Sequence, residues 1–276
     1  GGFVNRAPSH SVRDTEMKSL WIPRYEAYIR FHDLPGDEPA LVLLHGLGSA
    51  SSADFPSITH RLGLSRFRFI LPDFCGFGFS DRPSNFDYSL QAHAQTILQV
   101  LSYLNLSDVN LFGHSMGGAV AIALTAAHPE SVGRVVLAEA NLDPGKGQAS
   151  KLIASQSECE YVTDGHIRFL ESIRQGIRDS PGLSVYAGAL GIADPKAMYR
   201  SAVGLVRGTH PALRELFLSM KIPRAFIFGE YSLPDPNADL LRSAGIDVLL
   251  VPQAGHAMMH DNPDGFALAL LQSFQI

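Results

Sequence analysis

Cysteine is scarce in this chain of 276 residues, which holds only Cys75 and Cys159. Two cysteines cannot build a disulfide framework, so the disulfide-rich small folds are excluded. Long apolar runs are missing as well, since no stretch approaches the roughly 20 residues that cross a bilayer. The start, Gly1-Gly2-Phe3, lacks the order of a signal peptide. We therefore expect a cytoplasmic protein with no membrane partner.

Positive charge is also limited. The chain carries 22 Lys and Arg residues against 27 Asp and Glu residues, for a net charge of -5, and no basic cluster offsets this balance. Nucleic acid is therefore not an expected partner. Apolar side chains, in contrast, make up 46% of the sequence. That fraction and that length predict one α/β domain, with or without an inserted subdomain.

Short apolar runs recur along the chain, with helical patterns between them. The runs are 41–44, 68–71, 109–112, 134–137, 225–228 and 247–251, and the helical patterns are 90–104, 116–127, 238–244 and a last helix with Asn262 as its N-cap and Pro263 at its first position. This alternation predicts a mostly parallel, doubly wound sheet. Residues 20–22 and 27–31 add an antiparallel entry hairpin, for about eight strands in all.

One long segment breaks this rhythm. Residues 142–220 show no strand pattern and predict helices over 150–160 and 164–177, with two more that open at Asp194-Pro195 and His210-Pro211. We expect these helices to form a cap that is inserted after the sixth strand. The α/β core then comprises residues 1–141 and 221–276.

The run Gly113-His114-Ser115-Met116-Gly117 fits the pattern G-x-S-x-G. This pattern is typical of a sharp strand-to-helix turn that exposes a serine hydroxyl at its apex. Glycines flank the serine because the turn brings backbone segments too close for a Cβ atom. The pattern indicates nucleophilic acyl transfer by Ser115, although it is short enough to arise by chance.

Three further motifs accompany this turn and make chance negligible. Together the four motifs resemble those of the α/β-hydrolase family, in the family's order: His45-Gly46-Leu47-Gly48, Asp73-Phe74-Cys75-Gly76-Phe77-Gly78-Phe79-Ser80, Gly113 to Gly118, and Gly255-His256. The resemblance spans nearly the whole chain. It implies the α/β-hydrolase fold, with these motifs after the third, fourth, fifth and eighth strands.

The chemistry of such a site assigns roles to these residues. A serine hydroxyl is a poor nucleophile near neutral pH, so Ser115 needs a base to take its proton. His256 can take this proton and return it to the leaving group. The backbone N–H of Met116 would stabilise the oxyanion of the intermediate, and the resemblance implies that the N–H of Leu47 does the same.

The acid that orients His256 is left open by the sequence. The family's usual position, about three residues after Gly229, holds Ser232 here, while Asp235 lies three residues further on. Some family members take the acid from the end of the sixth strand, where this chain has Glu139. We favour Glu139, because a carboxylate after a buried strand needs a partner such as an imidazole. Asp235 is the second candidate, followed by Glu230 and Asp143.

No cofactor or metal is expected. His256 and His260 stand four residues apart, but no glutamate follows His256 as in H-E-x-x-H, and a helix start lies beyond both. The pattern Gly46-x-Gly48 lacks the third glycine of a dinucleotide loop, since Ser51 occupies that position.

Two kinds of function fit these features. The first is a serine hydrolase that cleaves a small, fairly apolar ester or related acyl compound. The second uses the same scaffold otherwise, as a carbon–carbon bond hydrolase, a lyase, a perhydrolase or a slow ligand sensor. Relatives that open epoxides or remove halides have an aspartate in place of Ser115, so the resemblance disfavours those reactions. The expected partner is a small-molecule substrate, and the sequence does not indicate an oligomeric state.

Overall fold

A computed structural model describes residues 16–180 and 182–276. Within these residues eight strands form one sheet in the order β1-β2-β4-β3-β5-β6-β7-β8. The strands β1 and β2 pair antiparallel, as do β2 and β4, and the other neighbours are parallel. The expected sheet and its entry hairpin are confirmed. The strands are β1 (Met17–Ile22), β2 (Ala27–Leu34), β3 (Asp37–Leu44), β4 (Phe67–Pro72), β5 (Val109–His114), β6 (Val132–Ala138), β7 (Arg224–Gly229) and β8 (Asp247–Val251).

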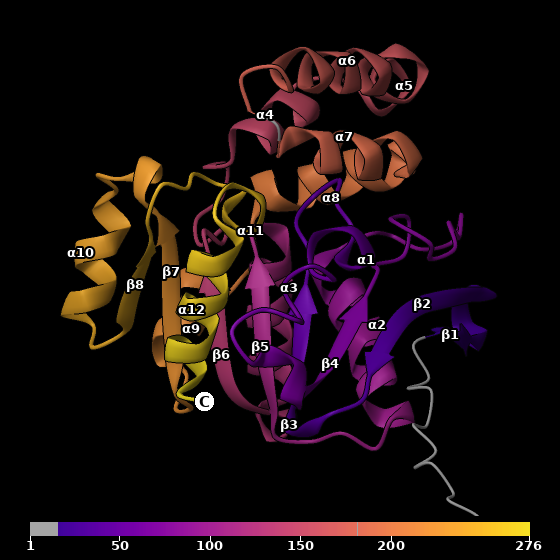
Figure 1. The fold of residues 1–276 in the computed structure, drawn as a ribbon. Helices are drawn as coiled ribbons and strands as arrows, with labels where there is room; N and C mark the ends of the chain where they lie inside the picture. The colour runs from indigo at the N-terminus through magenta and orange to yellow at the C-terminus, as the bar shows by residue number, and fades with distance from the viewer. Residues whose placement is uncertain (1–15, 181) are drawn as a thin grey trace, which may run out of the picture.

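The helices connect these strands and cover the sheet (Figure 1). No helix in the described ranges is both long and apolar enough to cross a membrane. The α-helices are α1 (Ser51–Asp54), α2 (Leu90–Tyr103), α3 (Met116–Ala127), α4 (Gln148–Ala154), α5 (Glu158–Glu160), α6 (His166–Gly176), α7 (Leu183–Ile192), α8 (Pro195–Arg207), α9 (Leu213–Ser219), α10 (Pro236–Ser243), α11 (Met258–Asp261) and α12 (Pro263–Phe274). Short 3-10 or π turns are η1 (Pro23–Tyr25), η2 (Leu64–Arg66), η3 (Pro129–Ser131), η4 (Tyr161–Gly165) and η5 (Glu230–Ser232).

The central strands of the sheet are buried on both faces, which explains their continuous apolar runs. Successive residues of β3 point to opposite faces, with Leu44 in the cluster beneath α2 and α3 and Leu43 in the cluster beneath α12. The same alternation places Leu111 and Phe112 of β5 in different clusters. Each face therefore has its own apolar core, and the central strands are fixed between the two cores.

The helical segment between β6 and β7 differs in detail from the expected one. Figure 1 shows α4 to α8 stacked beyond the carboxyl ends of the central strands, whereas α9 lies beside the sheet near β7. The helix expected over 150–160 is two helices, α4 and α5, because Ser157 begins a new helix with a capping box to Glu160. The helix expected at His210-Pro211 begins at Leu213. Helix α7 was not expected at all, whereas α8 begins after its predicted cap, Asp194.

The parallel strands bring their carboxyl ends to one edge of the sheet. Leu44 of β3 lies beside Gly113 of β5, which lies beside Leu137 of β6. The segments that follow these strands start with His45, Ser115 and Glu139. Loops at this edge are the usual location of ligand sites in open α/β sheets.

Substitution of Phe112 tests the apolar core beneath α12. The Phe112 ring is fully buried and contacts the rings of Phe55 and Phe266 edge to face, at centroid distances of 5.8 and 5.4 Å. We expect Phe112→Ala to lower the free energy of unfolding by about 3–5 kcal/mol in urea titrations. Phe79→Ala is the control, because Phe79 is 57% exposed. Equal losses in the two variants would contradict this account of the core.

Candidate active site

Ser115 lies at the tight turn between β5 and α3 with a strained backbone. Its φ angle is 52°, in the left-handed region that side chains with a Cβ rarely adopt. The flanking glycines allow the turn, since a Cβ at Gly117 would collide with Leu44 O and one at Gly113 would collide with Gly117 O. The amides of Gly118 and Ala119 donate to Ser115 O and close the first turn of α3. The helix thus begins at the serine, and the first amides of a helix lack intrahelical partners.

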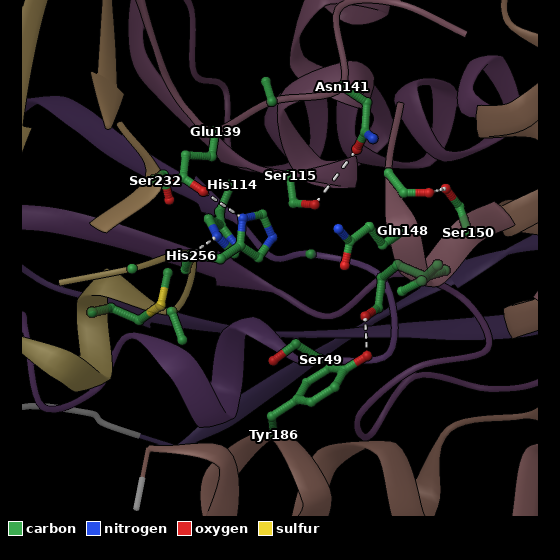
Figure 2. Close-up of a pocket in the computed structure, with 18 of the residues that line it drawn as sticks. Ser49, His114, Ser115, Glu139, Asn141, Gln148, Ser150, Tyr186, Ser232 and His256 are labelled. Carbon is green, nitrogen blue, oxygen red and sulfur yellow. Dashed lines mark hydrogen bonds and ion pairs between the residues drawn. The ribbon is translucent and has the colours of Figure 1, made fainter. Parts of the chain in front are cut away.

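His256 and Glu139 form the main polar contact near Ser115. His256 Nδ1 lies 2.7 Å from Glu139 Oε2 (Figure 2). Because an ionised carboxylate only accepts hydrogen bonds, Nδ1 carries the proton and Nε2 keeps a free lone pair. The His256 side chain is 57% exposed whereas that of Glu139 is 10% exposed. The arrangement is a buried carboxylate that orients an imidazole open to the cavity.

The surroundings of Glu139 favour its charged form. Burial alone would raise the pKa of its carboxyl group, but hydrogen bonds from His256, the Ser232 side chain and the Gly229 amide lower that pKa to about 2. Glu139 also has a positive φ angle, 40°, which directs its side chain from the end of β6 toward His256. The carboxylate therefore stays ionised at neutral pH and can stabilise an imidazolium.

The other three acid candidates bind elsewhere. Asp235 accepts a hydrogen bond from the Asn237 amide at 2.7 Å and caps α10. Glu230 accepts from the Gln253 amide at 2.7 Å. Asp143 forms an ion pair with Arg214, with an oxygen 2.8 Å from Nε. The structure brings Glu139 to His256, and it does not bring these three carboxylates there.

The loop after β3 directs the Leu47 amide by anchoring the peptide that contains it. The Phe74 amide donates to His45 Nε2 at 3.0 Å, so His45 carries its proton on Nδ1, which donates to Gly46 O at 2.8 Å. The Ser49 amide also donates to Gly46 O. In a trans peptide the C=O and N–H point in opposite directions, so these bonds turn the Leu47 N–H the other way. Burial lowers the pKa of His45 and keeps this brace uncharged.

Ser115 is not hydrogen-bonded to His256 within the described residues. Its hydroxyl is directed at Asn141 Oδ1, at a marginal 3.5 Å (Figure 2). Catalytic hydrogen bonds are often long in unliganded proteins and shorten with substrate bound. A rotation of the Ser115 side chain is therefore needed before its proton can pass to His256.

Two further histidines support the loops of the site. His114 Nε2 donates to His256 O at 2.8 Å, and so holds the backbone of the His256 loop. His260 Nε2 lies 2.9 Å from Asp54 Oδ1, a carboxylate that also accepts from Ser49 Oγ at 2.7 Å. His256 and His260 therefore contact different carboxylates rather than a shared centre. In the part of the chain that the structure describes, no three His, Cys, Asp or Glu side chains are grouped as metal ligands.

A cavity of about 1430 Å³ surrounds Ser115 and His256. Its lower wall comes from the loops at the sheet edge, and its upper wall from the helices between β6 and β7, through Phe169, Leu183 and Tyr186 among others. The aromatic side chains of Phe169 and Tyr186 line this cavity, whereas Tyr161 is fully buried in the same helical segment. The volume is large for a two-carbon substrate and admits a longer chain.

Sequence reasoning missed several polar contacts of the site. Ser232 occupies the family's usual acid position, and its side chain binds Glu139 instead. His114 anchors the His256 loop, a role that the sequence does not show. Asn141 and Tyr186 reach the site from the end of β6 and from α7. The serine at the acid position was the one visible signal, because a site that moves its acid needs a small donor there.

Part of the chain matches the sequences of known proteins. The model of the alpha/beta hydrolase fold family matches residues 39–156. An uncharacterized protein of Mycobacterium bovis is 36% identical over 129 residues, which cover 47% of this chain and 37% of that protein. The chain thus matches little more than a third of the length of this relative. Haloalkane dehalogenase 2 of the same species is 28% identical over 94% of this chain and 95% of its own length.

Solved structures share the fold over almost the entire chain. A thermophilic esterase from Thermogutta terrifontis with malate bound has a TM-score of 0.79 at 19% identity, covering 94% of this chain and 98% of its own. An N-acyl homoserine lactonase complexed with N-hexanoyl homoserine has a TM-score of 0.76 at 21% identity, covering 94% and 96%. Both of these related structures hold small molecules.

Acid stability tests the burial of His114. Burial, with a contribution from nearby His256, lowers the pKa of His114 from 6.5 to about 4. Between these values the unfolded chain binds a proton that the folded chain does not, so stability falls as pH falls from 6.5 to 4. We expect His114→Gln to reduce this slope by up to one proton, about 1.4 kcal/mol per pH unit. Unfolding titrations at several pH values measure how the free energy of unfolding changes with pH, and His60→Gln, at an exposed histidine, is the control. An equal dependence on pH in the two variants would refute the lowered pKa of His114.

Proposed function

The chain belongs to the alpha/beta hydrolase fold family, and on that premise we propose that it is a serine hydrolase acting on an uncharged, largely apolar ester, thioester or lactone. Ser115 is the nucleophile, His256 the base and acid, and Glu139 the residue that orients His256. The observation that carries this proposal is the 2.7 Å hydrogen bond between His256 Nδ1 and Glu139 Oε2. It leaves His256 Nε2 free to accept the proton of the serine.

The proposed reaction has two halves. Ser115 Oγ attacks the substrate carbonyl while its proton moves to His256 Nε2, and Glu139 stabilises the imidazolium. The tetrahedral intermediate expels its alcohol or thiol, which takes the proton from His256 and leaves an acyl-enzyme at Ser115. Water then attacks the acyl group with His256 as base, and the acid product departs as Ser115 regains its proton.

The proposed oxyanion hole consists of the Leu47 and Met116 amides. The anchored Gly46 carbonyl supports the first of these, because it fixes the direction of the Leu47 N–H. The N-terminal position of Met116 in α3 supports the second, because the first amides of a helix lack intrahelical partners. Removal of one such donor costs about 3 kcal/mol in comparable enzymes.

Residues 142–220 act in this proposal as a cap over the core formed by residues 1–141 and 221–276. The helices α4, α6 and α7 contribute residues to the upper wall of the cavity. Such a cap excludes water and selects the substrate by its shape. The two proteins of similar structure are an esterase and a lactonase, and both activities fit the chemistry proposed for this cavity.

The similarity to a haloalkane dehalogenase suggests a different reaction, but Ser115 argues against it. Relatives of that kind are expected to have an aspartate at the nucleophile position, and this chain has Ser115 there. A serine cannot form the ester intermediate that a carboxylate nucleophile forms with an alkyl halide. We therefore propose acyl transfer rather than halide removal.

The charge of the cavity wall favours neutral substrates. Lys146 is the single lysine or arginine of the described chain that lines the cavity. No ion pair joins Asp179 or Asp261 to a basic side chain within the described residues. A substrate carboxylate would therefore meet net repulsion. The lining carboxylates are Asp54, Glu139, Asp143, Asp179, Asp235 and Asp261.

Hydrolysis of p-nitrophenyl butyrate by matched variants tests the proposed triad. We expect Ser115→Ala to abolish turnover and Glu139→Gln to lower kcat by roughly 10²- to 10⁴-fold, because the amide no longer stabilises the imidazolium. Asp235→Asn is the matched control, since it makes the same chemical change at a carboxylate that binds elsewhere. Its kcat should stay within about threefold of the parent.

Two results would count against this assignment. Turnover that survives Ser115→Ala would exclude the serine mechanism. A large loss in Asp235→Asn with little change in Glu139→Gln would move the acid to the loop after β7.

Paired substrates test the proposed preference for neutral molecules. The p-nitrophenyl ester of a neutral acyl chain and that of an equally long chain ending in a carboxylate differ only in charge. We expect kcat/KM to be at least about tenfold lower for the anionic ester at low salt, with a smaller gap at high salt. Asp179→Asn should reduce the difference in kcat/KM between the neutral and the anionic ester, because it removes one negative charge from the cavity wall. Equal rates on the two esters at low salt would refute the preference.

A further inference from the structure

We infer that Tyr186 of helix α7 is a positioning residue, which holds the oxyanion loop in its working geometry from the cap side of the cavity. Its hydroxyl donates to Leu47 O at 3.0 Å (Figure 2). This inference rests on the proposed function, because it assigns Tyr186 a role in directing the Leu47 amide at the intermediate. It makes a cap residue part of the support of the catalytic core.

Leu47 lies between two peptides that are held separately. The peptide before it contains Gly46 O, which accepts from His45 Nδ1 and the Ser49 amide. The peptide after it contains Leu47 O, which accepts from Tyr186. When both flanking peptides are fixed, the φ and ψ angles of the residue between them are fixed too. Without the phenol, the peptide after Leu47 loses this anchor, and the loop that carries the Leu47 N–H is held on one side of Leu47 only.

Tyr186 contacts the loop at Gly48, where no larger residue would fit. Gly48 has a φ angle of 78°, and a Cβ at this position would lie 2.9 Å from the Tyr186 hydroxyl and 3.0 Å from Leu190 Cδ1. The absence of a side chain at Gly48 therefore lets α7 rest directly on the loop. Burial raises the pKa of the Tyr186 phenol, so the group keeps the proton that it donates. The contact joins residues 139 positions apart in the sequence.

The loop is fixed at its far end by a second contact with the core. Asp54 in α1 accepts from Ser49 Oγ and from His260, which lies four residues after His256. Both of these contacts join residues of the core, so neither of them involves the cap. The Tyr186 bond is the contact to Leu47 O that depends on the position of the cap.

Tyr199 provides a matched control. Its hydroxyl donates to Gln156 O at 2.9 Å, a bond of the same kind between two parts of the helical segment. Tyr199→Phe and Tyr186→Phe each remove one hydroxyl that donates to a backbone carbonyl. A loss of general cap stability should affect the two variants alike, whereas loss of the oxyanion loop's support should affect only Tyr186→Phe.

The experiment measures kcat, KM and inhibition by an alkyl boronic acid, which forms a tetrahedral adduct with an active serine. For Tyr186→Phe we expect kcat on p-nitrophenyl butyrate to fall about tenfold with KM within about twofold, since a misdirected donor weakens binding of the intermediate rather than the substrate. The inhibition constant of the boronic acid should rise by a similar factor. For Tyr199→Phe, kcat, KM and inhibition should match the parent.

Ser115→Ala, measured in parallel, separates the possible failures. If Ser115→Ala abolishes turnover and Tyr186→Phe behaves like Tyr199→Phe, the role of Tyr186 is wrong and the proposed function stands. A rise in KM at unchanged kcat in Tyr186→Phe would also overturn the inference, because Tyr186 would then contact the substrate. If Ser115→Ala retains turnover, both the proposed function and the inference fall.

Discussion

Close approach of three backbone segments is the constraint on which this molecule depends. The turn between β5 and α3 is pressed against the end of β3, where Gly117 lies against Leu44 O. On its other side Gly118 lies against Ala140, just beyond β6. Only glycine fits at such contacts. The same close approach accompanies the positive φ angle of Ser115 and brings the ends of β3, β5 and β6 together at one edge of the sheet.

The polar contacts of the site are built on this crowded edge. His256 is held at its ring by Glu139 and at its backbone by His114, two residues from neighbouring strands. The loop after β3 is braced by the buried, neutral His45. Glu139 is thus the carboxylate that contacts the His256 ring, whereas the brace at His45 is uncharged.

Much of the fold could be predicted from local sequence features. The apolar runs located the central strands, because strands buried on both faces have few alternatives, and Asn262 marked the start of α12 through its side-chain cap. Helix α7 was missed because its apolar and small residues surround the helix, and two glycines interrupt it. The division between α4 and α5 was readable in Ser157-Glu158-Cys159-Glu160, a capping box that was not used.

The site could be predicted only as far as its motifs reach. Ser115, His256 and the loop at Leu47 carry local patterns, whereas the acid depends on which carboxylate approaches His256 in space. Glu139 lies 117 positions from His256, and no spacing rule connects the two. The supporting bonds from Ser232, His114 and Tyr186 are likewise products of packing, so the sequence alone could not assign them.

Covalent labelling of the serine tests the central claim most directly. An alkyl fluorophosphonate reacts with a serine that an oriented imidazole activates, and peptide mass spectrometry locates the adduct. The account predicts a single adduct on the peptide that contains Ser115, formed roughly a hundredfold more slowly in Glu139→Gln than in the parent protein. An unmodified Ser115, or equal labelling rates in the parent and Glu139→Gln, would contradict it.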